Sequence, residues 1–306
     1  MKKSIYGSVY VFIILIIGNV MIVAQTNMKP PIAKKVPKVL KIHGYEITDN
    51  YFWLRDRNEK KDPAIMDYLN AENTYTESFM NPHKAFTDKL YNEMIGRIKQ
   101  TDLSVPYKLG DFWYYSKTEE GKQYPVYVRA ETREGKGEQV LLDQNKLAEG
   151  FKYFSIGDFD VSEDGNFLAY STDTTGYRQY VLQIKNLKTG EILPDRIERV
   201  TSTAWSNNGK YLFVVQEHEE TKRSDKLFRH RVGTNENELL LEEKDPLFNI
   251  GVGKSRDNKI IFLGSYAKTS REYRFISADE PMDDWKIILP REAGHEYSVD
   301  HYGGGF

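Results

Sequence analysis

One turn pattern recurs along the second half of the chain at nearly constant spacing. A serine opens each turn, Gly or Asn closes it, and an aliphatic and aromatic run follows. The three clearest copies end at Gly165, Gly209 and Asn258, which lie 44 and 49 residues apart. Repeats of about this length with several short strands each are typical of propeller blades, because one blade cannot bury both of its faces alone. The repeat therefore predicts an all-β propeller.

The runs between the turns have the composition of strands. They are rich in aromatic and β-branched residues and are bounded by turn clusters. The clearest runs are Phe112–Tyr115, Tyr180–Ile184, Tyr211–Val215 and Ile260–Leu263. Counted from about Val105, the chain holds about four blades, and the glycines around Gly304 would begin a fifth. We therefore expect an incomplete propeller over residues 101–306 and a chain that is truncated within a repeat.

The residues before the repeats predict helices. Asp62-Pro63 and Asn81-Pro82 each place a capping residue before a proline, an arrangement favoured at helix starts. Apolar residues then recur at helical steps of three and four. These residues are Ile65, Tyr68, Ala71, Tyr75 and Phe79, then Phe86, Leu90, Met94 and Ile98. With a proline-rich arm at Met28–Pro37, we expect an arm and helical extension over residues 25–100 whose apolar faces need a partner.

The first 24 residues have the order of a secretory signal. Lys2 and Lys3 precede an apolar run from Val9 to Val23, and small and polar residues follow at Ala24. The run falls short of the roughly 20 apolar residues of a spanning helix and is interrupted by Gly18-Asn19. We expect a cleaved signal peptide over residues 1–24 and a periplasmic or secreted protein without stable membrane insertion. A retained anchor is the alternative.

Composition excludes several functions. Lys and Arg number 43 against 45 Asp and Glu, so the formal net charge is -2 and there is no basic excess for nucleic acid. The chain has no cysteine, which excludes disulfides, a thiol nucleophile, iron–sulfur clusters and cysteine-ligated zinc. We therefore expect no nucleic-acid partner.

A search for chemistry assigns no catalytic, cofactor-binding or metal-binding residue. The chain lacks the Gly-x-Ser-x-Gly pentapeptide of α/β-hydrolases, and the glycine-rich Gly251–Ser255 is interpreted as a blade turn rather than a phosphate loop. The histidines are scattered and include no helical zinc pair. They are His43, His83, His218, His230, His295 and His301.

Three polar clusters stand out in the sequence. Thr221–Asp225 is either a solvated blade loop or a loop that supplies charge at a domain boundary or substrate passage. Asp173–Arg178 has the composition of a turn between two strands and is interpreted first as such. Arg55 and Asp56 would pair with each other or with a further domain.

Long stretches of the chain resemble the amino-terminal part of the oligopeptidase B group within the prolyl oligopeptidase family of serine peptidases. The stretches are Pro30–Pro37, Tyr51–Asp56, Tyr68–Asn73, Arg97–Pro106, Tyr114–Pro125, Leu168–Gly176, Thr221–Asp225 and Pro290–Tyr297. The resemblance implies a seven-bladed propeller over an α/β-hydrolase domain, against which the amino-terminal helices pack. It also implies that short peptides enter and are cleaved after Arg or Lys.

In that family the Ser-Asp-His triad lies in the carboxy-terminal hydrolase domain, which this chain does not contain. We therefore expect the gating portion of an exported serine oligopeptidase, inactive by itself and without a cofactor. Its partners would be the hydrolase domain in cis and, through that domain, short basic peptides. The alternative is a stand-alone propeller that binds another protein, or an inactive gene remnant.

Overall fold

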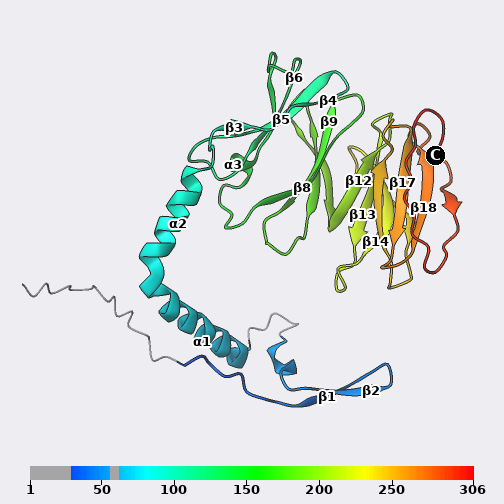
Figure 1. Cartoon of the computed structure of the whole chain (residues 1–306). Coiled ribbons are helices and arrows are strands. Elements are labelled where there is room, and N and C mark those ends of the chain that lie inside the picture. Colours follow the sequence, from blue (N-terminus) through cyan, green and yellow to red (C-terminus); the bar gives the residue numbers. More distant parts are fainter. Residues whose placement is uncertain (1–28, 56–61) are drawn as a thin grey trace, which may run out of the picture. The chain divides into compact units, whose positions relative to one another are not determined.

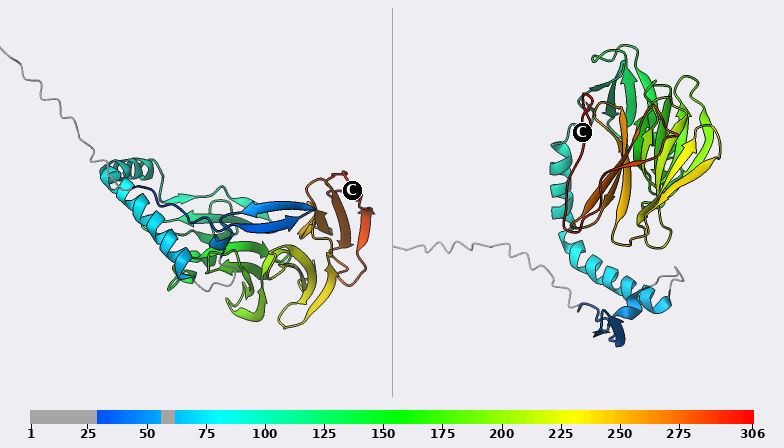
Figure 2. Two further views of the ribbon diagram at one scale, coloured as in Figure 1. Left: turned by 90° about the horizontal axis from the view of Figure 1, so that it is seen from below. Right: turned by 90° about the vertical axis from the view of Figure 1, so that its right-hand side faces the viewer.

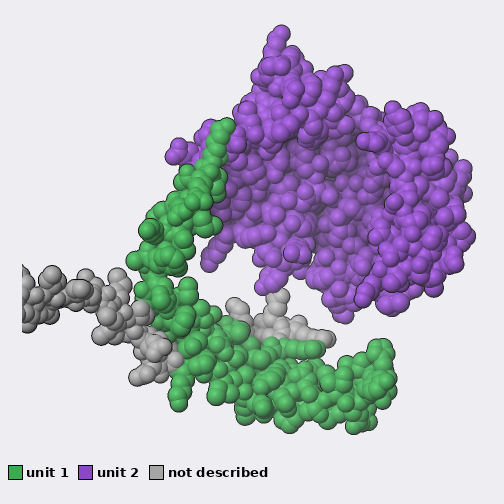
Figure 3. Space-filling view, viewed as in Figure 1, with its two compact units in different colours: residues 1–99 green, residues 100–306 purple. Residues whose placement is uncertain are grey.

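The computed structural model describes residues 29–55 and 62–306 (Figure 1). The chain forms two compact units, residues 1–99 and 100–306 (Figure 3). The expected signal peptide, residues 1–24, lies outside the described residues.

The first unit opens with a short hairpin that the sequence pattern did not predict. Strand β1 (Lys38–Ile42) pairs antiparallel with β2 (Tyr45–Asp49), and a single helical turn, η1 (Phe52–Leu54), follows. His43 and Gly44 connect the strands with φ of 50° and 83°. Positive φ at both turn positions matches the right-handed twist of a hairpin, which explains a glycine at the second position.

Two helices follow, as the capping pattern predicts. Helix α1 (Pro63–Met80) begins at Asp62, whose Oδ1 accepts a hydrogen bond of 2.9 Å from the Ala64 N–H. The second Asx-Pro pair forms a 3-10 turn, η2 (Asn81–His83), and helix α2 (Lys84–Gly96) begins only after it. No helix in the described residues is long and apolar enough to cross a membrane.

The apolar faces of these helices are largely uncovered. Ile65 is buried, but Phe79, Phe86 and Met94 are 56%, 62% and 65% exposed. Helices of this length gain most of their stability from packing an apolar face. The expectation that these faces need a partner therefore remains a prediction.

The second unit contains four antiparallel sheets that follow one another in chain order (Figure 2). Blade 1 contains β3 (Asp102–Leu103), β4 (Tyr107–Leu109), β5 (Phe112–Thr118), β6 (Val126–Ala130) and β7 (Gln139–Asp143), and the short α3 (Gln144–Leu147) follows. Blade 2 contains β8 (Ser155–Val161), β9 (Phe167–Asp173), β10 (Val181–Asn186) and β11 (Ile192–Glu198). Blade 3 contains β12 (Val200–Trp205), β13 (Tyr211–Glu217), β14 (Ser224–Arg231) and β15 (Asn237–Glu242). Blade 4 contains β16 (Asn249–Lys254), β17 (Ile260–Tyr266), β18 (Arg271–Ser277) and β19 (Lys286–Leu289).

The prediction of about four propeller blades is confirmed. The first strands of blades 2, 3 and 4, which we call the inner strands, are β8, β12 and β16, and β12 contacts both of the others. Blade 1 differs because its first strand is split: β3 pairs with the end of β5 and β4 with its start. Pro106, which has no N–H to donate, lies in the gap between β3 and β4.

The recurring turn joins the first and second strands of blades 2, 3 and 4, as predicted. In blade 3, the Ser206 N–H donates to the Tyr211 carbonyl, and the Tyr211 N–H donates back to Ser206 Oγ at 3.1 Å. Ser162 and Ser255 make the same two contacts five residues ahead. The buried serine thus satisfies a backbone donor that the tight turn leaves unpaired.

Aromatic and aliphatic side chains fill the space between neighbouring blades. Trp205 is completely buried. Its ring stacks on Phe167 of blade 2 with centroids 6.3 Å apart, and its Nε1 donates to the Asp160 carbonyl at 3.1 Å. One side chain thus joins the apolar cores and the backbones of two blades.

Residues 290–306 form no strand. Tyr302 and Gly305 make an isolated bridge, and the Phe306 ring lies 4.7 Å from that of Phe275 on blade 4. The glycines that would begin a fifth blade therefore form a turn against the fourth.

Trp205→Ala is expected to lower the free energy of unfolding by about 3–5 kcal/mol, because it opens a cavity between blades and removes a buried hydrogen bond. Urea unfolding followed by circular dichroism measures the change. Tyr302→Ala, at a side chain that is 75% exposed, serves as the control and should cost less than about 0.5 kcal/mol. Similar losses in both variants would contradict the assigned role of Trp205.

Candidate functional site

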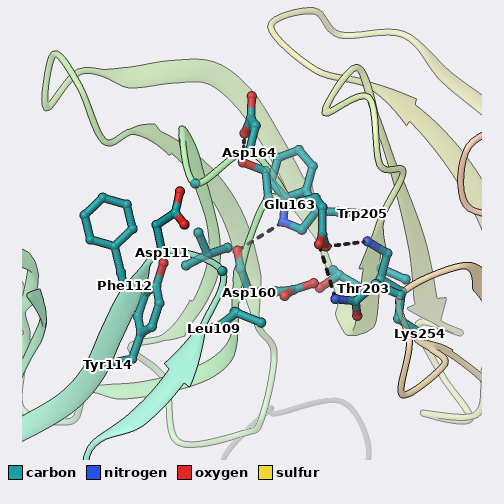
Figure 4. A pocket seen from close by; sticks show the side chains of 16 residues that line it. Leu109, Asp111, Phe112, Tyr114, Asp160, Glu163, Asp164, Thr203, Trp205 and Lys254 are labelled. Carbon is teal, nitrogen blue, oxygen red and sulfur yellow. Dashed lines mark hydrogen bonds and ion pairs between the residues drawn. The ribbon is translucent and has the colours of Figure 1, made fainter. Parts of the chain in front are cut away.

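The inner strands β8 and β12 carry a cavity near each of their ends. The first, which we call the turn-end cavity, has a volume of about 300 Å³ and lies beside the recurring turns (Figure 4). It is lined by aromatic rings and by carboxylates from blades 1 and 2, with Trp205 of blade 3 and Lys254 of blade 4. The aromatic side chains are Phe112, Tyr114 and Trp205, and the acids are Asp111, Asp160, Glu163 and Asp164.

Lys254 lines this cavity and connects three blades. Its Nζ lies 2.6 Å from Asn207 Oδ1 of blade 3 and 3.3 Å from Glu163 Oε2 of blade 2. Asn258 Nδ2, also from blade 4, donates to the other oxygen of Glu163 at 3.3 Å. The ion pair is well shielded on the lysine side, where the side chain is 16% exposed. It therefore ties blade 4 to blade 2 across blade 3.

Asp160 is the most perturbed acid of the turn-end cavity. Burial raises the pKa of Asp160 to about 7, against the opposing attraction of Lys254. The neighbouring negative charges of Asp158 and Glu163 add to the rise in this pKa. A carboxyl in this state exchanges protons near neutral pH.

Asp164 behaves differently in the same cavity. Burial alone would raise the pKa of Asp164, but hydrogen bonds from Ser162 and Asn166 outweigh burial and hold it below the ordinary value. The Ser162 hydroxyl donates to Asp164 at 2.6 Å. This serine is therefore part of the turn and is not paired with a histidine base, as a nucleophile would be.

The second cavity, which we call the loop-end cavity, has a volume of about 620 Å³ and involves the opposite halves of β8 and β12. The structure brings together here the two loops that the sequence singled out. Arg178 of the β9–β10 loop lines it together with Lys222 of the β13–β14 loop and Ser224 at the start of β14. Glu217 connects two cations at this end, because its Oε1 lies 3.5 Å from Lys222 Nζ and 3.6 Å from Arg199 Nη1.

Other members of the same two loops hold the backbone in place. Arg223 donates to the carbonyls of Glu243, Asp245 and Phe248, the connection from blade 3 to blade 4. Asp173 is buried and accepts hydrogen bonds from backbone N–H groups of its own loop, including that of Arg178 at 2.8 Å. Each loop thus divides into residues that shape the turn and residues that face the cavity.

Of the glycine-rich stretch Gly251–Ser255, Lys254 lines the turn-end cavity. The interpretation of this stretch as a blade turn is wrong for residues 251–254, which lie in β16 and pair with β17; only Ser255 belongs to the turn, which it opens. Arg55 packs over the Phe52 ring at 4.7 Å, while Asp56 lies outside the described residues.

The histidines have separate environments. His230 is buried between blades 2 and 3, with Nε2 2.6 Å from Asp195 Oδ1. His301 Nδ1 lies 2.9 Å from Asp257 Oδ2. His218 accepts from the Glu220 and Thr221 N–H groups within its own turn. Across residues 29–55 and 62–306, no group of three His, Asp or Glu could hold a metal ion.

The sequence search missed the residues that carry the charge of the cavities, among them Asp158, Asp160 and Lys254. One signal was available for Lys254. Aligned on the turn serines, blades 2 and 3 have the apolar Val161 and Trp205 where blade 4 has this lysine. A charge at an otherwise apolar repeat position marks a departure from the blade pattern.

The pH dependence of Asp160 can be tested. A folded carboxyl with a pKa near 7 holds its proton where an unfolded aspartate, with a pKa near 4, has lost it. The folded state therefore binds more protons between about pH 4 and 7, so this group lowers the free energy of unfolding as pH rises through that window. Asp160→Asn removes this effect. The free energy of unfolding of the variant, relative to that of wild type, should therefore be more than about 1 kcal/mol higher at pH 8 than at pH 5.

Urea unfolding at the two pH values measures this difference. The control is Asp164→Asn, which removes an acid whose pKa is lowered and should destabilise the protein to a similar extent at both pH values. A pH-independent effect of Asp160→Asn would contradict the assignment.

Comparison with known proteins identifies the family of this propeller. Residues 30–306 match the family model described as prolyl oligopeptidase, N-terminal beta-propeller domain. The chain is 41% identical over 298 residues to dipeptidyl aminopeptidase BI of Pseudoxanthomonas mexicana, and 36% identical over 287 residues to protease 2 of Moraxella lacunata. These alignments cover 92% and 90% of this chain, which spans about 41% of the length of each relative.

Solved structures agree with this assignment. Oligopeptidase B from Leishmania major superposes with a TM-score of 0.83 at 28% identity, over 90% of this chain and 41% of that one. Oligopeptidase B from Trypanosoma brucei gives a TM-score of 0.81 at 29% identity, with the same coverage. The resemblance stated from the sequence is confirmed. The chain belongs to the prolyl oligopeptidase family of serine peptidases and contains the family's N-terminal β-propeller domain.

Proposed function

We propose that this chain is the propeller portion of an exported serine oligopeptidase that cleaves short peptides after Arg or Lys. The observation that carries the proposal is the match to the family propeller over residues 30–306, together with the similarity to two oligopeptidase B structures. The acidic lining of the turn-end cavity supports a basic substrate, because the lining contains four acids, Asp111, Asp160, Glu163 and Asp164, and only one lysine.

In this proposal the chemistry takes place on a hydrolase domain in the part of the relatives that this chain does not span. A serine attacks the peptide carbonyl, a histidine transfers the proton, and an aspartate orients the histidine. The propeller selects substrates by excluding folded proteins from the site and by limiting water there. The exposed apolar faces of α1 and α2 would pack on the hydrolase domain, which agrees with the exposure of Phe86 and Met94.

A second activity is favoured by the similarity to dipeptidyl aminopeptidase BI, at 41% identity. A dipeptidyl aminopeptidase removes two residues from a free amino terminus, whereas an oligopeptidase cleaves within a peptide. Both activities fit a propeller that admits only short chains. A third possibility is a stand-alone propeller that binds another protein, and it differs in requiring no hydrolase domain.

Turnover by a protein that joins residues 25–306 to a family hydrolase domain tests the proposal. We expect hydrolysis of an N-blocked peptide with Arg before the scissile bond, sensitive to a serine-directed inhibitor, and no turnover by the 306-residue chain alone. A dipeptidyl p-nitroanilide distinguishes the aminopeptidase activity, because a dipeptidyl aminopeptidase releases p-nitroaniline from the form with a free α-amine and not from the N-blocked form. Reproducible, inhibitor-sensitive hydrolysis by the 306-residue chain would contradict the proposal that catalysis takes place on the hydrolase domain.

Export is tested by amino-terminal sequencing of the protein recovered from its native host. The proposal predicts a mature protein that begins at or near Gln25, because the small residues before it resemble a cleavage site. Recovery of an intact Met1 or Lys2 terminus from the cytoplasm would contradict export. It would leave the peptidase proposal untouched.

A further inference from the structure

The base of the loop-end cavity is formed at an irregular point of β8. Ile156 pairs with Thr172 and Phe159 with Tyr170, so two residues of β8, Gly157 and Asp158, lie opposite the single residue Ser171. This is a β-bulge, a feature that redirects a side chain and is common beside active sites. The bulge is held by the Asp158 N–H, which donates to Ser171 Oγ at 2.8 Å.

Gly157 is required for this geometry. A Cβ at this position would lie 2.6 Å from Ser171 Oγ and 2.7 Å from the Tyr180 ring, closer than real Cβ contacts. Glycine thus lets the Tyr180 ring and Ser171 approach the backbone of the bulge. Asp158, the next residue, lines the loop-end cavity.

Asp158 has an unused hydrogen-bonding position. Its Oδ2 atom is fully enclosed and has no hydrogen-bond partner among the described residues. Burial also raises the pKa of this carboxyl, as expected for an acid that lacks compensation. Asp195, Glu217 and Asp225 also carry an enclosed oxygen without a hydrogen-bond partner, but each of these side chains has an ion pair, whereas Asp158 has none among the described residues. A carboxylate that lacks both kinds of partner is costly, so Asp158 indicates a group that binds there.

The rim of the loop-end cavity is also irregular. Arg178 and Lys222 have φ of 60° and 59°, in the left-handed region that non-glycine residues seldom occupy. Such strain concentrates at binding and catalytic sites. In β12 the pairing with β13 shifts between Val200 and Ser202, which leaves Thr201 as an extra residue at the cavity. The equivalent pair β16–β17 of blade 4 shows no shift.

Together these features describe a site for a peptide with a positively charged nitrogen. We propose that the loop-end cavity binds the ammonium or guanidinium group of a short peptide against Asp158, with Arg178 and Lys222 facing carbonyl or carboxylate oxygens. This inference rests on the proposed peptidase function and names the part of the substrate that the propeller recognises. The cavity volume of about 620 Å³ is within the usual range for small-ligand sites.

The charged nitrogen has two possible sources, the α-amine of the peptide or a Lys or Arg side chain. Three peptide probes separate them. Trialanine amide carries only an α-ammonium, acetyl-Ala-Arg-Ala-amide carries only a guanidinium, and acetyl-trialanine-amide carries no charge. Titration of each probe into the 306-residue chain, followed by calorimetry or by NMR shifts, reports binding without any requirement for turnover.

We expect at least one charged probe to bind, the uncharged probe to bind at least about tenfold more weakly, and Asp158→Asn to lose about tenfold in affinity for the charged probe. The matched control is Asp284→Asn, which makes the same change at an exposed position of blade 4 and should leave affinity unchanged. Asp158→Asn should also keep or raise the melting temperature, because it removes a buried charge. A residue with a purely structural role would lower it.

Two outcomes would overturn the inference. One is equal affinity of wild type and Asp158→Asn for the charged probe. The other is no difference between charged and uncharged probes, which includes the absence of binding by all three. Either result would leave the proposed hydrolysis standing, because that proposal is tested by turnover of the protein with its hydrolase domain. Failure of turnover with intact binding would instead reject the peptidase proposal alone.

Discussion

Burial of blade faces against neighbouring blades is the constraint on which the described propeller depends. A four-stranded antiparallel sheet has two faces, and in blades 2 and 3 both are covered by other blades. Trp205 illustrates the result, since its ring packs on Phe167 of the preceding blade while its Nε1 donates to the Asp160 carbonyl. The recurring serine turn serves the same end, because it lets each first strand reverse tightly and leaves the blade faces free to pack.

The two cavities lie at opposite ends of the inner strands, and each is lined by an acid of β8. Asp158 and Asp160 are two residues apart on β8, and one lines each cavity. Burial raises the pKa of both carboxyls, a cost that core packing alone would not require. At the turn end, the positive charge of Lys254 partly offsets the rise in the pKa of Asp160. At the loop end Asp158 Oδ2 has no partner among residues 29–55 and 62–306, and this difference directs the binding inference to that end.

The two loops that sequence reasoning singled out show why charge alone does not identify a site. Thr221–Asp225 includes Arg223, whose guanidinium donates hydrogen bonds to three backbone carbonyls. It also includes Lys222, which lines the loop-end cavity. In Asp173–Arg178 the aspartate binds the backbone of its own loop and the arginine lines the cavity. Adjacent residues in one loop thus have structural and potential binding roles, and composition does not separate them.

The sequence by itself determined the elements whose signals are local: the serine turns at blade spacing, the aromatic strands, the Asp62 cap of α1 and the family. It missed the β1–β2 hairpin and the start of α2 after a 3-10 turn, where several local conformations compete. Only the tertiary structure decided which polar residues meet. Lys254 and Glu163 are 91 positions apart and come together only when three blades pack, because side chains from different blades share no local pattern. The placement of Asp158 and Lys222 in one cavity likewise depends on a bulge in blade 2 and on the packing of blade 3 beside it, and no sequence window contains both.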